Sequence, residues 1–131
     1  WMHAKDIIHR NLKLDNLFVG KGNKVKIGGL DLAVWAQEEK LIAGTPTFMA
    51  PEVLQKKGAT KLSDVYSFAI VLWCLVTAST RTCPPEVTQF SELVDFVCSG
   101  ERMPLPQTLP ECVANLIRAC WAPNPHDRPT F

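Results

Sequence analysis

The stretch that decides the fold is "IIHRNLKLDNLFV", which runs from Ile7 to Val19. It places His9, Arg10 and Asn11 in a row between two apolar runs, with a second asparagine at Asn16. The amide oxygen of Asn11 can accept a hydrogen bond, but an amide does not take up a proton near neutral pH. The stretch therefore raises the question of what chemistry such a loop retains.

Composition indicates a globular unit that binds nothing by bulk charge. The chain has 131 residues, of which 47% are hydrophobic and 21% charged, and this balance is typical of one buried core. Its 14 basic and 13 acidic side chains are interspersed and leave a net charge of +1. We therefore expect no nucleic-acid partner and no attraction to an anionic membrane.

The cysteines and the apolar runs favour a cytoplasmic, intracellular protein without a membrane segment. The five cysteines form no CxxC pair, and their odd number argues against a closed disulfide framework. The most apolar run, from Val65 to Ala78, is 14 residues long, short of the roughly 20 that span a bilayer. Because the chain opens on Trp1 and stops at "DRPTF", where a helix should start, we expect a fragment truncated at both ends.

The apolar pattern predicts a mainly α fold with one small β-hairpin. The segment from Leu62 to Thr77 is expected to be a long helix, with Ser63 and Asp64 as its cap and first-turn charge. Two more helices are predicted within 90–100 and 111–121. The runs "NLFVG" and "KVKIG", joined by "KGNK", are typical of a hairpin. Residues 28–52 show no period and are expected to form one long loop.

Five motifs give the chain its family resemblance. They are "HRNLKLDN", "KIGGLDLA", "GTPTFMAPE", "SDVYSFAIVLW" and "CWAPNPHDRPTF". In the order and spacing of these motifs, the chain resembles the C-terminal lobe of a eukaryotic protein kinase. Lys13 resembles the serine/threonine type of catalytic loop, while the last two motifs are similar to the tyrosine-kinase-like group. The resemblance implies a single kinase-like domain over 1–131, with the N-terminal lobe absent from this chain.

Two carboxylates that the family uses for phosphoryl transfer are missing here. The resemblance puts Asn11 at the position of the catalytic base and Gly29 at the position of a metal-binding Asp. Loss of general base catalysis costs roughly 10² to 10⁴ in rate. Asn16 is the remaining metal position, and it is a neutral, weak ligand for Mg²⁺. We therefore expect that Mg²⁺ is not bound productively and that ATP binds weakly.

Other positions leave alternatives open. Asp31, two residues after Gly29, would face the same side of an extended backbone and could replace the lost ligand, or it could be a solvated loop residue. Lys13 corresponds to the residue that reaches a γ-phosphate, but it could also be an exposed loop lysine. Phe18 corresponds to the apolar floor under adenine, and core packing would explain it equally well.

The family also suggests how the loop is regulated. Arg10 would pair with a phosphorylated residue in active relatives. Here Thr45 is the only hydroxyl between Gly29 and Pro46, and it matches the Thr that contacts the catalytic loop. Leu41 stands where the phosphosite would be, so a phosphoswitch is not expected. Glu38 or Glu39 could serve Arg10 as a fixed negative partner, or could simply be solvated.

The structural positions of the family are retained. Asp64 resembles the residue that accepts hydrogen bonds from the catalytic-loop backbone, and Glu52 and Arg128 match the pair that ties the "APE" loop to the last helices. His9 and Leu30 resemble buried positions of the core. His3 and His126 have no evident ligand partner, and we expect them to be surface or packing residues.

A fold that keeps its structural residues without its two carboxylates favours a pseudokinase C-lobe over an enzyme. Such a protein would act in intracellular signalling by contact with a protein partner, for example an active kinase, or by allosteric control of it. The expected contact surface includes residues 29–52 and 90–98. The alternative is a weakly active serine/threonine kinase rescued by Asp31. A third interpretation is a truncated or nonfunctional product, because a lone lobe would expose the apolar face that meets the N-terminal lobe.

Overall fold

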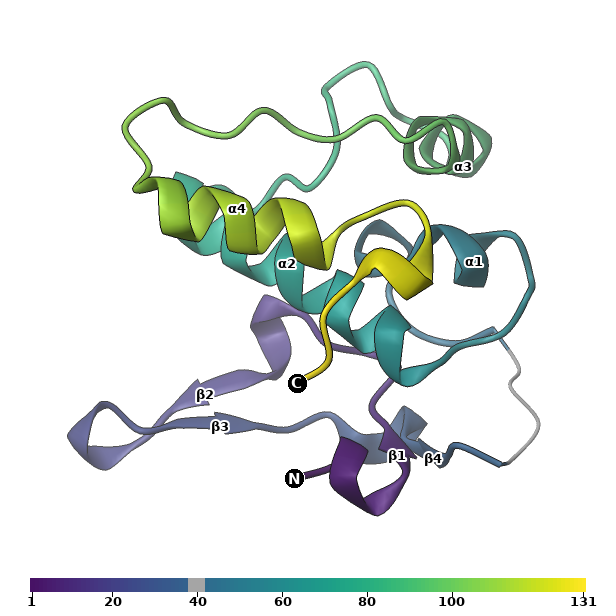
Figure 1. Cartoon of the computed structure of the whole chain (residues 1–131), viewed down its shortest axis with the longest axis vertical. Coiled ribbons are helices and arrows are strands. Elements are labelled where there is room, and N and C mark those ends of the chain that lie inside the picture. Colours follow the sequence, from purple (N-terminus) through teal and green to yellow (C-terminus); the bar gives the residue numbers. More distant parts are fainter. Residues whose placement is uncertain (38–41) are drawn as a thin grey trace.

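The computed structural model describes residues 1–37 and 42–131. Figure 1 shows the helices gathered on one side and the short strands on the other, with the long helix α2 running between them. The strands form two antiparallel pairs, β1 with β4 and β2 with β3. This is the mainly helical architecture with a small hairpin that the sequence predicts.

Helix α2 (Lys61–Thr77) forms the centre of the core. Val65, Tyr66 and Ala69 are each at most 1% exposed, and helix α4 (Glu111–Cys120) packs along α2. The helix begins at Lys61, one residue before the predicted start, and Thr60 is its cap. Ser63 is therefore the third helical residue of a capping box, and its Oγ accepts a hydrogen bond from the Thr60 N–H at 3.0 Å. The prediction of Ser63 as the cap is therefore wrong, because the cap is Thr60, about one helical turn earlier.

The predicted helices in the second half are confirmed. Helix α3 (Phe90–Cys98) and helix α4 lie within the predicted segments and bury one apolar face each. Helix α1 (Pro51–Leu54) was not predicted, because four residues are too few to show a helical period. All four residues of α1 are buried, and α3 packs against them.

The predicted hairpin is also confirmed. Strand β2 (Leu17–Val19) pairs with β3 (Val25–Ile27), and Leu17 lies opposite Ile27. Gly22 and Asn23 in the turn have φ of 71° and 57°. Gly and Asn adopt this left-handed conformation more readily than other residues, which explains why the chain reverses here.

The prediction of one long loop over 28–52 is wrong. Strand β4 (Val34–Trp35) lies within it and pairs with β1 (Ile7–Ile8), so that Ile7 is opposite Trp35. The segment also contains the first two residues of helix α1 and two 3-10 turns, Leu30–Leu32 and Pro46–Phe48. Each element has two to four residues, which is too short for a periodic signal.

The remaining 3-10 turns connect these elements. They are His3–Lys5, Leu14–Asn16, Lys21–Asn23 and Pro125–Asp127. Within the described ranges, none of the helices combines the length and apolar character needed to cross a bilayer.

Candidate functional site

Asp64 holds the loop at residues 9–11 in place. Its side chain is 1% exposed at the start of α2, and its two carboxylate oxygens accept hydrogen bonds from the backbone N–H groups of His9 at 2.8 Å and Arg10 at 2.9 Å. Arg10 has φ of 66°, a conformation that costs free energy for a residue other than Gly. The two hydrogen bonds from a buried carboxylate offset this cost and fix the direction of the chain.

His3 is a member of this site that the sequence did not reveal. Its Nε2 lies 2.8 Å from Oδ2 of Asp64, and its ring centroid lies 5.0 Å from that of Phe131. His3 is a packing residue, as expected, and the N-terminal 3-10 turn brings it to α2, where it also contacts Asp64. No signal in the sequence marks this contact, since 61 residues separate the two side chains. His126 is exposed, and its backbone N–H donates to Asn124 Oδ1.

Asn11 is tied to the molecule by three hydrogen bonds. Its amide oxygen Oδ1 accepts from the hydroxyl of Thr45 at 3.1 Å, so the Thr contact implied by the resemblance is present. Its backbone oxygen accepts from Nδ2 of Asn16 at 2.7 Å, and its N–H donates to Nδ1 of His9 at 3.2 Å. The side-chain oxygen at the base position is therefore already the acceptor of an internal hydrogen bond.

His9 is buried as expected and links two segments. Its side chain is 2% exposed, and Nε2 lies 2.9 Å from the carbonyl oxygen of Gly28. Because Nδ1 accepts the N–H of Asn11, the proton of a neutral ring lies on Nε2 and is donated to Gly28. The imidazole thus connects the loop at 9–11 to the end of β3.

The metal positions do not offer the donors that Mg²⁺ needs. Gly29 has no side chain, and the Nδ2 group of Asn16 is used as a donor to Asn11. What remains is one neutral amide oxygen, whereas Mg²⁺ is usually held by one or two carboxylates in octahedral geometry. Among residues 1–37 and 42–131, no three His, Cys, Asp or Glu side chains are grouped to hold a metal ion.

Asp31 does not follow Gly29 along an extended backbone. Gly29 has φ of 71° and ψ of 43°, and Leu30–Leu32 form a 3-10 turn. The premise that Asp31 faces the same side as position 29 is therefore wrong, because an alternation of sides requires an extended chain. The Asp31 side chain is exposed.

Three further candidate residues are exposed to solvent, fully or in part. Nζ of Lys13 is 3.7 Å from Oδ2 of Asp15, in a pair that solvent reaches. Phe18 is 56% exposed, so packing in the core of this chain does not explain it. Leu30 is 54% exposed, which corrects the expectation of a buried position.

Arg10 contacts the loop that follows Gly29. Its Nε donates to the carbonyl oxygen of Leu32 at 2.6 Å. This bond joins the loop at 9–11 to the 3-10 turn without a phosphate group. Glu38, Glu39 and Leu41, which the sequence analysis considered as partner and phosphosite positions, lie outside the described residues.

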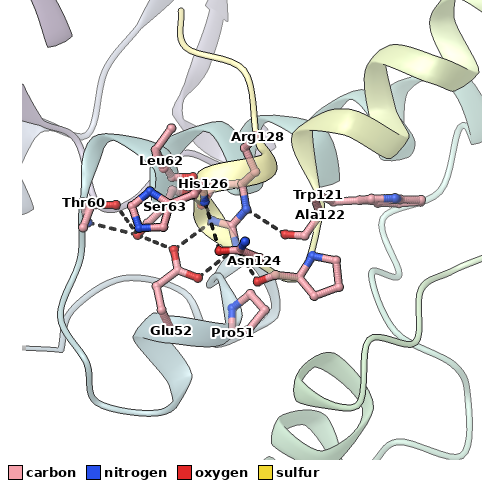
Figure 2. Close-up of polar contacts among 12 residues, drawn as sticks. Pro51, Glu52, Thr60, Leu62, Ser63, Trp121, Ala122, Asn124, His126 and Arg128 are labelled. Carbon is pink, nitrogen blue, oxygen red and sulfur yellow. Dashed lines mark hydrogen bonds and ion pairs between the residues drawn. The ribbon is translucent and has the colours of Figure 1, made fainter.

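Glu52 and Arg128 form a buried ion pair, and Figure 2 shows its hydrogen bonds. Arg128 donates to both carboxylate oxygens, at 2.8 and 2.9 Å, and Ser63 Oγ donates to Oε1 at 2.8 Å. The other guanidinium N–H groups donate to three backbone carbonyls, those of Leu62, Ala122 and Pro123. All five N–H groups of Arg128 thus have an acceptor.

Burial and charge act in opposite directions on Glu52. Burial alone would raise the pKa of its carboxyl, but the hydrogen bonds and positive charge of Arg128 outweigh it. The pKa of Glu52 therefore lies below its ordinary value of 4.5. The pair ties α1 and the start of α2 to the last residues of the chain.

Comparison with known proteins supports the kinase resemblance. A family model described as "Protein tyrosine and serine/threonine kinase" matches residues 1–131. The probable serine/threonine-protein kinase drkD of Dictyostelium discoideum is 39% identical over 135 residues, which is 100% of this chain and 10% of that protein. The serine/threonine-protein kinase CTR1 of Arabidopsis thaliana is 39% identical over 137 residues, which is 100% of this chain and 16% of that protein.

A third relative also matches the whole length of this chain. The dual specificity protein kinase shkE of Dictyostelium discoideum is 34% identical over 139 residues, which is 100% of this chain and 19% of that protein. The chain thus spans only about a tenth to a fifth of the length of these curated relatives.

Proposed function

Since this chain belongs to the protein tyrosine and serine/threonine kinase family, we propose that it is the C-terminal lobe of a pseudokinase domain. The protein takes part in intracellular signalling through contacts with a protein partner, such as an active kinase, or by allosteric control of that partner. It does not transfer phosphate at a rate that matters for signalling.

The observation that carries this proposal is the environment of Asn11. An amide does not accept a proton near neutral pH, and the Asn11 oxygen already accepts the Thr45 hydroxyl at 3.1 Å. A substrate hydroxyl at this position would meet no base. The expected loss is roughly 10² to 10⁴ in rate from general base catalysis alone.

The metal positions add to the deficit. Asn16 is neutral and donates to the Asn11 carbonyl, and Gly29 contributes no ligand. ATP supplies the phosphoryl group in the family, and divalent ions neutralise its charge there. With these donors we propose weak ATP binding and no productive Mg²⁺ binding.

Exposed apolar side chains support a role in contact with a protein partner. Trp35 and Ile42, in the segment 29–52, are 52% and 46% exposed, and Phe90 at the start of α3 is 58% exposed. Large apolar residues are enriched in protein interfaces. We propose that these two segments belong to the contact surface.

The second candidate is a weakly active, ATP-dependent serine/threonine kinase. It is favoured by relatives that carry the name of kinases and by the presence of Lys13 and Asn16. This candidate needs a carboxylate that replaces the metal ligand missing at position 29, and Asp31 is the residue proposed for that role. Asp31 would have to leave its 3-10 turn to serve.

The two candidates are separated by phosphate transfer from radiolabelled ATP in the intact protein. We expect no transfer to the protein itself or to a general substrate in Mg²⁺ or Mn²⁺ above the level of a Lys13→Ala variant. Transfer that is lost in Asp31→Ala but kept in Asp127→Ala, an exposed control, would favour the enzyme. A thermal shift with ATP is expected to be unchanged by Mg²⁺; added stabilisation by Mg²⁺ would contradict the proposal.

A further inference from the structure

A cavity with an empty volume of about 310 Å³ opens to solvent among residues of α2, α3 and the segments that follow them. Its apolar walls include Ile70 of α2, Phe96 of α3 and Met103, which comes after α3. Thr47 also lines it. Because Thr47 belongs to the segment 29–52 and Phe96 to the segment 90–98, the cavity lies within the contact surface proposed above.

Arg102 brings a positive charge to the wall of this cavity. Its Nε and Nη2 donate to the backbone oxygen of Trp121 at 3.1 and 3.0 Å. Its Nη1 donates to the backbone oxygens of Val97 at 3.0 Å and Glu101 at 2.6 Å. One N–H of Nη2 is left over, and no carboxylate in the described part of the chain forms an ion pair with this guanidinium. Burial lowers the pKa of Arg102, as expected for a cation that is withdrawn from water without an anion beside it.

Three neutral donors that line the same cavity also lack a partner. They belong to Tyr66, Thr82 and Trp121, which are 1%, 8% and 6% exposed. Among the residues that the structure describes, neither the two hydroxyl groups nor the indole N–H has a hydrogen-bond partner. Every fully buried side-chain polar atom in the same residues does have one, so these three atoms are open to a group that enters from solvent. The cavity therefore offers hydrogen-bond donors to an acceptor that the chain itself does not supply.

The charge balance of the cavity fits one carboxylate. The guanidinium carbons of Arg102 and Arg128 lie 5.1 and 5.2 Å from the centroid of the Tyr66 ring. Arg128 is neutralised by Glu52, so that only the charge of Arg102 is uncompensated here. A phosphorylated side chain carries more negative charge than a carboxylate and is usually bound by a cluster of arginines. The apolar walls favour an acidic side chain that has apolar neighbours.

We propose that this cavity binds the carboxylate of an aspartate or glutamate side chain of the protein partner, flanked in the partner by apolar residues. Arg102 pairs with the carboxylate, and the hydroxyl groups of Tyr66 and Thr82 donate hydrogen bonds to it. The apolar walls contact the flanking residues. The inference rests on the proposed function in assuming a protein partner, and it names the chemistry by which that partner is recognised.

The test is calorimetric titration of the intact protein with a terminally blocked pentapeptide that carries a glutamate between two leucines. A second peptide carries glutamine in place of the glutamate, and a third carries phosphoserine. We expect the glutamate peptide to bind roughly 10-fold or more tightly than the glutamine peptide, because hydrogen bonds to a charged group are stronger than those between neutral groups. The phosphoserine peptide should bind no more tightly than the glutamate peptide.

Four variants assign the binding to this cavity. Tyr66→Phe and Thr82→Val each remove a hydroxyl that has no partner in the described residues, so both should fold. Each should weaken binding of the glutamate peptide roughly 2- to 10-fold. Arg102→Gln should abolish the preference for glutamate over glutamine. Arg118→Gln is the matched control, because Arg118 is an exposed arginine of α4 outside the cavity, and it should keep that preference.

Equal affinities for the glutamate and glutamine peptides would overturn the proposal, as would a lack of binding of the glutamate peptide at millimolar concentration. If Arg102→Gln does not fold, Tyr66→Phe and Thr82→Val decide the question, and unchanged binding by both would overturn the proposal. Tighter binding of the phosphoserine peptide would contradict the assignment to a carboxylate. Peptide binding is measured without ATP, so its outcome is independent of the phosphate-transfer assay that tests the proposed function.

Discussion

Removal of Arg128 should strongly destabilise the fold, because it breaks a buried ion pair. The Arg128→Ala variant leaves the Glu52 carboxylate buried without its cation, and Glu52 is only 7% exposed. Breaking a buried pair from one side costs about 3–5 kcal/mol. Three backbone carbonyls lose their donor as well, at about 1 kcal/mol for each that water does not reach. Such a loss is a large part of a typical domain stability of about 5–15 kcal/mol.

The assay is denaturant unfolding followed by tryptophan fluorescence, with Arg118→Ala as the matched control. Arg118 pairs with Glu111 at 3.2 Å, but both side chains are more than half exposed. A surface pair of this kind contributes about 0–1 kcal/mol. Arg128→Lys should be intermediate, because an ammonium cannot make the two parallel bonds to the carboxylate.

Equal effects of Arg128→Ala and Arg118→Ala would refute the reasoning. So would a loss below about 1 kcal/mol for Arg128→Ala, since it would mean that water reaches the Glu52 carboxylate and replaces the cation. A second check is Glu52→Met combined with Arg128→Met. Because the buried charge is then absent, this pair should cost less than Arg128→Ala alone.

Three further outcomes follow from the same contacts. The pKa of Glu52 is held below 4.5, so the stability that its ionised form contributes is fully present above pH 4.5 and is lost as the pH falls below it. In acid, the free energy of unfolding of Glu52→Gln should therefore depend less steeply on pH than that of the wild type. Burial raises the pKa of Tyr66 to about 12. The absorbance difference between wild type and Tyr66→Phe should therefore show phenolate only near that pH or on unfolding. A titration near pH 10 in the folded protein would contradict the burial. His3→Ala should lower the free energy of unfolding by about 1–3 kcal/mol, because Asp64 keeps its two backbone donors but loses the imidazole. Thermal unfolding measures this loss. No change would mean that the His3 contact is not formed in solution.

Most of the fold could be predicted from the sequence because its larger elements have strong local signals. Helices α2, α3 and α4 show apolar residues at helical spacing, and the Gly-Asn turn marks the hairpin. Strand β4 and helix α1 could not be predicted, since each is stabilised by a partner far away in the chain. Val34 and Trp35 pair with β1, and no property of these two residues alone indicates it.

The site shows the same division between local and distant information. The roles of Asp64 and of the Glu52 and Arg128 pair were expected from motif resemblance and not from physical reasoning on the sequence. The contact of His3 with Asp64 could not be found, because nothing in the sequence spacing indicates it. The exposure of Leu30 could not be predicted either, because the apolar character of this residue does not tell which other residues pack against it.

The two departures from the kinase pattern differ in their physical consequences. At position 11 the side-chain oxygen accepts a hydrogen bond from Thr45, and a carboxylate would accept the same bond more strongly. Asn11→Asp should therefore fold normally. At position 29 the backbone is left-handed and the Asn16 amide fills the space of a Cβ, so a side chain there requires the Asn16 amide to shift. A return to activity therefore needs more than the exchange of two side chains, because a base at position 11 fits the present loop, whereas a ligand at position 29 also requires the Asn16 side chain to move.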